Sequence, residues 1–440
     1  MTHRGSRVLH VGSLARVEGE GALHLSIDGT TVTEARLALY EPPRFFEAFL
    51  RGRRHTEPPD ITSRVCGICP VAYQMSACRA VEDACRVTVE GQLAALRRLL
   101  YCGEWIESHT LHIYLLHAPD FFGCDSAIEL SRTHRSHVER GLRLKQAGNA
   151  IMELLGGRAI HPVNIRVGGF HRTPDPAELR PLAARLRQAH QDAQETLHWV
   201  SGFDFPDAEC DADLLALAQR GTYAIDAGTP TVLPYGDGRR LRAFPVRDFT
   251  RHVTEEQVPH STALQAGLDG RRHLTGALAR YAISGHLLPP SVREAAAAAG
   301  LDGVCRNPFR SVVVRAVEVL YAVTEALRLI DAYEPPPLPA VEVRPRAAVG
   351  HGATEAPRGT LYHRYTLDGE GIVTDARLIP PTSQNQAAIE EDLRRLVQEA
   401  LDLGEATEAE LTRLCERAIR NHDPCISCSA HFLDLTVERT

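Results

Sequence analysis

The sequence predicts a mainly α-helical protein with small β elements, folded as a single domain over residues 1–440. Three observations support this fold class. Apolar residues recur at helical spacing through most of residues 42–333, alternating patterns typical of strands occur at 21–40 and 359–379, and two C-x-x-C pairs lie near opposite ends of the chain. We therefore expect one large helical core, with the cysteine pairs as its most distinctive chemical feature.

Composition excludes several broad classes of protein. The 440 residues are 44% hydrophobic and 24% charged, and no apolar run is long enough to span a bilayer. The first residues, MTHRGSRVLHVG, lack the apolar stretch of a secretory signal. The net charge of -7 is spread without a basic block, so no nucleic-acid partner is expected. Eleven cysteines in a chain of this size indicate metal or redox use in a reducing compartment, which predicts a cytoplasmic location.

Residues 1–41 are predicted to form N-terminal strands. The stretch GALHLSIDGTTVTEARLALY alternates in the manner of strands on both sides of Asp28-Gly29. An Asp-Gly pair between two alternating runs is a strong hairpin signal. We therefore expect a small sheet at the start of the fold.

Residues 42–333 are predicted to form the helical core. Long stretches carry apolar side chains three and four residues apart, which is typical of helices packed in a core. One of them ends at Gly156-Gly157, which resembles a glycine C-cap. The predicted helices cover residues 92–117, 136–157, 177–200 and 311–333.

The last part of the chain is divided by composition. Residues 334–358 are expected to form a linker, with the stiff proline-rich stretch EPPPLPAVEVRPR followed by a loop that contains Arg358. Residues 359–431 are expected to contain a strand pair (359–379), helices near 386–403 and 407–421, and the second cysteine motif. Residues 432–440 remain as a short tail.

The two cysteine pairs, Cys66/Cys69 and Cys425/Cys428, could form a cage of four thiolates. A C-x-x-C pair at the start of a helix directs two sulfurs to one site, and four soft sulfurs suit zinc, an iron–sulfur cluster, or nickel and iron. A structural zinc site is one reading, although more than 350 residues separate the pairs, far beyond the usual zinc spacing. A disulfide oxidoreductase fits less well, because the small βαβ domain of that class is missing from the pattern.

The residues around the cysteines resemble a known family. RVCGICPVAY (64–73) and DPCISCSAH (423–431) are similar to the two signature motifs of the nickel–iron hydrogenase large subunit. Four further segments resemble family segments in the same order: ARVEGEG (15–21), FFEAFLRGR (45–53), GGRAIHPVNIRVGG (156–169) and EAPRG (355–359). Each string alone is weak, but their common order along almost the whole chain makes the resemblance specific.

The resemblance implies a buried dinuclear metal site within the helical core. By carry-over, Cys66 and Cys425 would be terminal thiolates on nickel, and Cys69 and Cys428 would bridge nickel to iron. Iron in this family also carries carbon monoxide and cyanide, which accessory proteins must install. The implied substrate is H2, which the family cleaves reversibly into protons and electrons.

The resemblance also assigns residues around the metals. Arg358 matches the arginine that lies over the open coordination site, where a fixed cation has an electrostatic role. Glu18 matches the glutamate that relays protons from the thiolate of Cys425. Asp120 and Asp423 match acidic residues that flank the arginine and hold its orientation.

Three more residues are implied as ligands or donors. Glu47 and His431 match the positions that bind a magnesium ion near the dinuclear centre. Thr382, in IPPTSQN, is a candidate hydroxyl donor to a cyanide nitrogen. Where the first motif of the family usually ends in histidine, this chain has Tyr73, which can donate a hydrogen bond but cannot take up a proton near neutral pH. The other seven cysteines are expected to be mostly buried small hydrophobic residues.

The implied assembly has several partners. An iron–sulfur small subunit would take the electrons, and the compact length and DPCISC resemble the cytoplasmic branch in which flavin-containing diaphorase subunits pass electrons to NAD(P). A maturation endopeptidase is expected to remove residues 432–440 after metal insertion by accessory proteins. Two alternatives stay open, a metal-free subunit like that of quinone-reducing complexes and a zinc-stabilised structural protein. Metal analysis separates all three.

Overall fold

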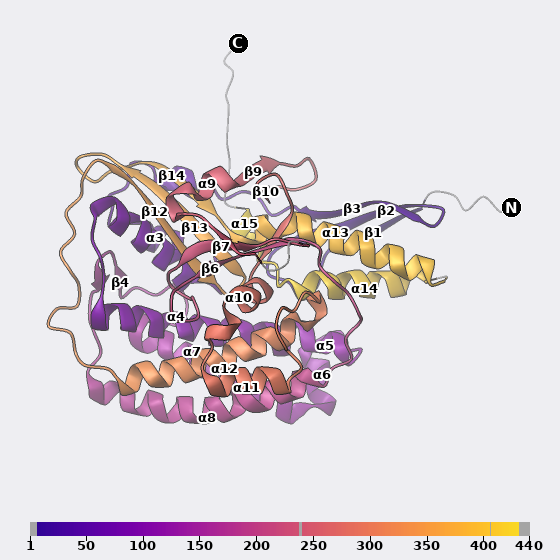
Figure 1. Cartoon of the computed structure of the whole chain (residues 1–440), viewed down its shortest axis with the longest axis horizontal. Helices are drawn as coiled ribbons and strands as arrows, with labels where there is room; N and C mark the ends of the chain where they lie inside the picture. The colour runs from indigo at the N-terminus through magenta and orange to yellow at the C-terminus, as the bar shows by residue number, and fades with distance from the viewer. Residues whose placement is uncertain (1–6, 237–239, 405, 431–440) are drawn as a thin grey trace, which may run out of the picture.

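Four long helices form the helical layer of the protein. The computed structural model describes residues 7–236, 240–404 and 406–430. The helical layer contains α4 (Gly91–Leu111), α7 (Arg135–Gly156), α8 (Pro176–Ser201) and α12 (Ser311–Asp331), drawn below the sheets in Figure 1. These helices confirm the four predicted from the apolar spacing. The predicted fold class, mainly helical with small sheets, is also confirmed.

Helices α4 and α7 cross closely because glycine faces glycine at their contact. A Cβ atom on Gly148 would lie 2.6 Å from the carbonyl oxygen of Gly103, so no larger residue fits without moving the backbone. The close crossing leaves α4 almost entirely enclosed from Leu96 to Thr110. Beyond Leu111 the helix continues as one π-helical segment, η1 (His112–His117). The helix α4 therefore forms the centre of the layer, and its buried polar residues lie within the core.

Two three-stranded sheets cover further parts of the core. The N-terminal sheet has the order β1 (Arg7–Val11), β2 (Gly21–Asp28), β3 (Thr31–Leu39), and packs on α13 (Pro381–Asp402). The second sheet has the order β12 (Ala348–Ala356), β13 (Gly359–Leu367), β14 (Val373–Ile379), and packs on α3 (Pro70–Cys85). Both predicted strand pairs are confirmed, and each sheet gains one strand that the alternation did not reveal.

The structure corrects two expectations about secondary structure. The helical period expected throughout 42–333 is wrong between residues 213 and 275, where several short strands form: β6 (Asp213–Ala218), β7 (Thr229–Leu233), β8 (Arg242–Ala243), β9 (Val253–Gln257), β10 (Leu264–Leu268) and β11 (His273–Thr275). The expected linker 334–358 is a connector only in its first part, because β12 occupies residues 348–356. Strands buried on both faces, such as DLLALA, lack the alternation that identifies a half-buried strand.

Shorter elements complete the fold. They include α1 (Phe46–Leu50), α2 (Pro58–Thr62), α5 (Ala118–Phe121), α6 (Ala127–Thr133), α9 (Phe249–His252), α10 (Ala277–Ser284), α11 (Pro290–Ala298), α14 (Glu408–Asn421), α15 (Ile426–Ser429), and the strand pair β4 (Ile165–Arg166) and β5 (Gly169–Phe170). Helices α13 and α14 lie beside the N-terminal sheet in Figure 1. Among the described residues, no helix combines the length and apolar character that crossing a membrane requires.

Candidate metal centre

The four motif cysteines meet at one buried site. The Sγ atoms of Cys66, Cys69, Cys425 and Cys428 all lie within 4.8 Å of one another, and each residue is at most 3% exposed. Sγ of Cys66 is 3.4 Å from Sγ of Cys425, and Sγ of Cys69 is 3.3 Å from Sγ of Cys428. The prediction that the two distant pairs share one site is confirmed.

Two helix starts and a short backbone bridge bring the cysteines together. Cys69 is the N-cap residue of α3, and Cys425 is the N-cap residue of α15. Glu18 pairs with Cys425 in an isolated parallel β-bridge, and the N–H of Ile426 donates to the Glu18 carbonyl oxygen at 2.9 Å. The segment around Glu18 therefore fixes the position of the second cysteine motif.

The electrostatics of the cluster fit a bound cation. Burial raises the pKa of the Cys428 thiol, whereas hydrogen bonds from neighbouring thiols, Cys425 first, lower the pKa of Cys66. Four thiolates this close cannot all ionise in a buried site without positive charge between them. Four soft sulfur donors suit nickel and iron, and zinc as well. The donor set of this chain therefore fits the metals that the resemblance implies.

Glu18 contacts the cluster through its carboxylate. Oε2 of Glu18 is 3.0 Å from Sγ of Cys425 and accepts a hydrogen bond from the Ser427 N–H at 3.1 Å. Burial and the nearby charge of Cys66 raise the pKa of Glu18. A carboxyl group with a raised pKa, in contact with a thiol, is suited to exchanging a proton with it.

Arg358 lies at the turn between β12 and β13 and is 2% exposed. Its Nε donates to the Asp423 carbonyl oxygen at 2.9 Å, and its Nη2 donates to Asp423 Oδ1 at 3.1 Å. Nη1 is buried and has no hydrogen-bond partner among the described residues. Asp423 has a φ of 51°, a left-handed conformation that is uncommon outside glycine. The strained backbone of Asp423 thus holds a guanidinium group with one donor still available.

Comparison with known proteins identifies the family. A family described as nickel-dependent hydrogenase matches residues 44–141 and 312–431. The chain is 33% identical to sulfhydrogenase 1 subunit alpha of Pyrococcus furiosus, over 97% of this chain and 98% of that protein. The chain belongs to the nickel-dependent hydrogenase large-subunit family. It is the catalytic large subunit of a nickel–iron hydrogenase, an oxidoreductase.

Other relatives show the same membership. The hydrogenase subunit is 28% identical to the NAD-reducing hydrogenase HoxS subunit beta of Cupriavidus necator, over 97% of this chain and 95% of that protein. Its fold matches a crystal structure described as an NAD+-reducing [NiFe]-hydrogenase in the H2-reduced state, with a TM-score of 0.87 and 25% identity over 97% of this chain and 99% of that chain. The similarity therefore extends over the whole architecture and beyond the cysteine motifs.

Asp120 of the hydrogenase subunit lies near the arginine site but bonds elsewhere. Its carboxylate accepts hydrogen bonds from Arg420 at 2.8 Å through both oxygens, and from Arg16 at 2.5 Å. Among the described residues, these arginines take the place that was expected for Arg358. Arg420 lies three residues before Asp423, so Asp120 reaches the Arg358 site through the segment 420–423.

Thr382 and Glu47 are placed by backbone contacts. The hydroxyl oxygen of Thr382 accepts the Cys425 N–H at 3.0 Å, so this side chain borders the cysteine cluster. Oε1 of Glu47 accepts the Leu378 N–H at 2.7 Å. His431, the other predicted magnesium ligand, lies outside the described residues.

Tyr73 occupies a buried position beside the cluster. Its hydroxyl donates to the Cys428 carbonyl oxygen at 3.3 Å, and its ring centroid is 5.6 Å from that of His363. His363 is fully buried on β13, and sequence reasoning missed it because the alternating stretch LYHRY shows only a strand. Of the other cysteines, Cys124 and Cys305 are partly exposed and the rest are buried, as expected.

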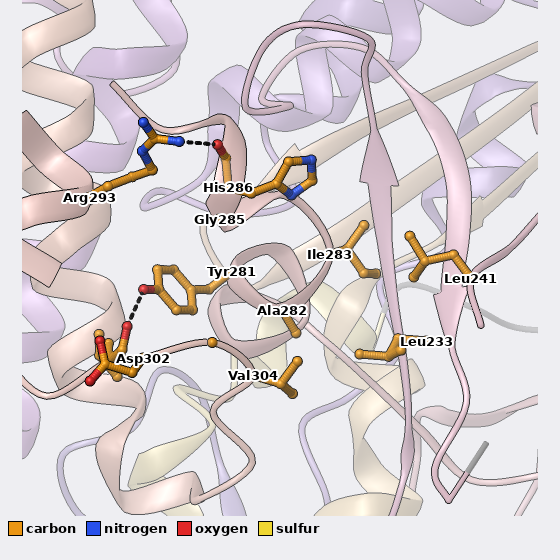
Figure 2. Close-up of a pocket in the computed structure, with 12 residues that line it drawn as sticks. Leu233, Leu241, Tyr281, Ala282, Ile283, Gly285, His286, Arg293, Asp302 and Val304 are labelled. Carbon is orange, nitrogen blue, oxygen red and sulfur yellow. Dashed lines mark hydrogen bonds between the residues drawn. The ribbon is translucent and has the colours of Figure 1, made fainter. Parts of the chain in front are cut away.

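A surface cavity of about 410 Å³ lies apart from these residues. Tyr281, Ile283 and His286 line it together with Leu233 and Leu241, and Figure 2 shows the Tyr281 hydroxyl and Arg293 making hydrogen bonds at its edge. None of the predicted site residues lines this cavity. The four cysteines of the metal centre are instead buried, at most 3% exposed each, which suits a substrate as small as H2.

Proposed function

We propose that the chain catalyses the reversible heterolytic cleavage of H2 at a nickel–iron centre. Cys66 and Cys425 would be terminal ligands of nickel, and Cys69 and Cys428 would bridge nickel to iron. The convergence of four buried thiols beside Glu18 and Arg358 carries this proposal. When bound, nickel and an iron with carbon monoxide and cyanide ligands would polarise H2 and accept its electrons.

The proton would leave through Glu18. The contact of 3.0 Å between Cys425 Sγ and Glu18 Oε2 lets a proton move between the two atoms without rearrangement of the backbone. The Ser427 N–H also bonds Oε2, which holds the carboxylate toward the sulfur. Glu18 is only partly buried, so its carboxyl group would release the proton toward the solvent.

Arg358 would act on H2 by electrostatics. Asp423 binds two of its donor nitrogens, while Nη1 has no hydrogen-bond partner among the described residues and would be available to act on H2. Asp120 would support this arrangement by holding Arg420, in the same turn as Asp423. Thr382 accepts a hydrogen bond from the Cys425 N–H, so its hydroxyl hydrogen is left to donate to a cyanide nitrogen.

A magnesium ion would lie near the second motif. Glu47 and His431 are the proposed ligands, completed by water, since a hard cation prefers oxygen and tolerates one imidazole. Glu47 is already oriented by the Leu378 N–H. The ion would tie α1 to the C-terminal segment and so help to keep Cys425 and Cys428 in place.

An iron–sulfur small subunit is the proposed electron acceptor. Gly67, between the first two cysteines, is exposed, and Ile160 beside it is 57% exposed. His161 is held against this surface by a hydrogen bond to the Ser63 carbonyl oxygen at 2.8 Å. An exposed isoleucine against the residue that follows Cys66 would suit the docking of a partner that takes electrons.

Coupling to NAD(P) in the cytoplasm extends this proposal. The relatives include an NAD-reducing hydrogenase subunit and a sulfhydrogenase subunit, which supports flavin-containing diaphorase subunits as further partners. Metal-insertion accessory proteins would assemble the centre, and a maturation endopeptidase would cut after His431. The accessory proteins would supply the carbon monoxide and the cyanide, and the endopeptidase would produce the final C-terminus.

Metal analysis and infrared spectroscopy test the proposed function. The purified protein is expected to contain nickel and iron in equal amounts and to show carbon monoxide and cyanide bands. Cys425→Ala should lose nickel and H2 uptake. Cys78 is an equally buried cysteine on α3 outside the cluster, and Cys78→Ala should keep both properties. Zinc alone would indicate the structural protein, and a metal-free protein would indicate the quinone-reductase type.

A further inference from the structure

Glu104 on α4 is a fully buried acid whose hydrogen bonds go to the helix of the first cysteine pair. Its Oε2 accepts the Val71 N–H at 2.6 Å, and its Oε1 accepts the Ala72 N–H at 3.1 Å. Its exposed fraction is 0%, and among the residues that the structure describes no arginine, lysine or histidine pairs with it. A buried acid without a cation costs free energy, so its presence here calls for a function.

The start of α3 explains why an outside group is needed. Cys69 is the N-cap residue, and its side chain makes no capping hydrogen bond. Its sulfur lies 3.3 Å from the sulfur of Cys428 instead. Pro70 has no N–H, so Val71 and Ala72 carry the first free amides of the helix. Glu104 therefore supplies, from α4, the cap that Cys69 cannot supply while it faces the metal site.

The geometry points to the ionised form of Glu104. Burial raises the pKa of this carboxyl group well above its usual value, and the N–H groups of Val71 and Ala72 offset part of that rise. Both carboxyl oxygens accept amide hydrogens, and among the described residues Glu104 makes no hydrogen bond in which a neutral carboxyl group would donate its hydroxyl hydrogen. The positive end of α3 further favours a negative charge at this position.

We infer that Glu104 is a positioning residue of the metal centre: it holds the first turn of α3, and thereby Cys66 and Cys69, while its negative charge takes up the positive end of that helix. Without it, the free amides of α3 would draw electron density from the sulfur of Cys69. With it, the thiolates keep that density for the metals. The electronic part rests on the proposed nickel–iron centre, whereas the capping part does not.

Amide hydrogen exchange tests the capping part on the full chain produced without nickel. Glu104→Gln should speed exchange at Val71 and Ala72 about tenfold, because the side-chain amide presents a donor where the carboxylate accepted. Glu107→Gln is the matched control: Glu107 lies one turn along α4, is also buried, and bonds Lys145, the only lysine of the chain, rather than α3. Unchanged exchange in Glu104→Gln, or equal acceleration in the control, would overturn the inference.

Infrared spectra of the metal-loaded enzyme test the electronic part. Glu104→Gln should shift the carbon monoxide and cyanide bands to higher wavenumber, because less electron density reaches the iron. Glu104→Asp keeps the charge and should return the bands most of the way to their wild-type positions. Wild-type bands in Glu104→Gln would refute the electronic role. If Glu104→Gln does not accumulate, the capping role is tested on Glu104→Asp. Slow amide exchange at Val71 and Ala72 in Glu104→Asp would support the capping role. Fast exchange at these amides in a Glu104→Asp protein with normal metal content would contradict it.

Discussion

The carboxylate of Glu18 lies 3.0 Å from the sulfur of Cys425, although 406 residues separate them in the sequence. A backbone bridge between the same two residues holds this contact, so the acid and the thiol are positioned by the main chain as well as by their own hydrogen bond. The relationship links the N-terminal segment directly to the chemistry of the C-terminal motif.

Glu18→Gln should block proton exchange while leaving metal loading intact. A glutamine side chain fills the same space and can still bond Ser427, but it cannot carry a proton from the thiol. We expect exchange between D2 and solvent protons to fall by about 100-fold or more, the usual size of a lost general acid–base group. Glu20→Gln, on an exposed residue of the same segment, is the control. Exchange at the wild-type rate in Glu18→Gln would exclude the relay.

Arg358→Lys should load nickel and iron normally and turn over H2 about 100-fold more slowly, as expected when one preorganised electrostatic group is lost. Lysine keeps the charge but has one nitrogen, so it cannot reproduce the paired bonds to the carbonyl and the carboxylate of Asp423 and still keep the separate, unpartnered nitrogen that arginine has in Nη1. Steady-state H2 oxidation and metal content measure the two effects separately. Arg344→Lys, at an exposed arginine of the connector, should match the wild type. Unchanged turnover in Arg358→Lys would mean that Arg358 has only a structural role.

The buried position of His273 predicts that the folded protein loses stability in acid. Burial lowers the pKa of His273 to about 4, against 6.5 for an exposed histidine. Between these two pKa values the unfolded chain binds a proton that the folded chain does not, so this contribution is present above pH 6.5 and is lost as the pH falls toward 4, by about 3 kcal/mol in total. Urea unfolding as a function of pH should show a shallower acid slope for His273→Gln. The exposed His286→Gln should keep the wild-type slope; equal slopes in all three proteins would refute the prediction.

The C-terminal tail should be absent from the active enzyme. Residues 432–440 follow His431, and a chain end at His431 would let Cys425 and Cys428 enter the core beside the first pair. Intact-mass measurement should give a chain ending at His431 in nickel-loaded protein and at Thr440 in nickel-free protein. Active, nickel-loaded enzyme that still ends at Thr440 would show that His431 is not a processing site.

Local patterns were sufficient where a structure depends on neighbours in the sequence. The helical period predicted α7 and α8 to within one residue at each end, because one face of each is apolar and the other is polar. The same reasoning failed for β6, whose residues are apolar on both faces, and for β12, which follows a proline-rich connector and contains two glycines. Both strands also depend on partners far away in the sequence, β11 for β6 and α3 for β12, which no local window contains.

The sequence by itself determined the metal-binding motifs and the main helices, since each depends on residues close together along the chain, and the family resemblance, since the order of such motifs can be read directly from the sequence. The tertiary structure placed Glu18 against Cys425, as the resemblance implied, and it alone decided that Asp120 bonds Arg420 rather than Arg358 and that Glu104 caps the helix of Cys69. The physical reason is that a buried polar group must find its partner in space, and that partner can come from any part of the chain.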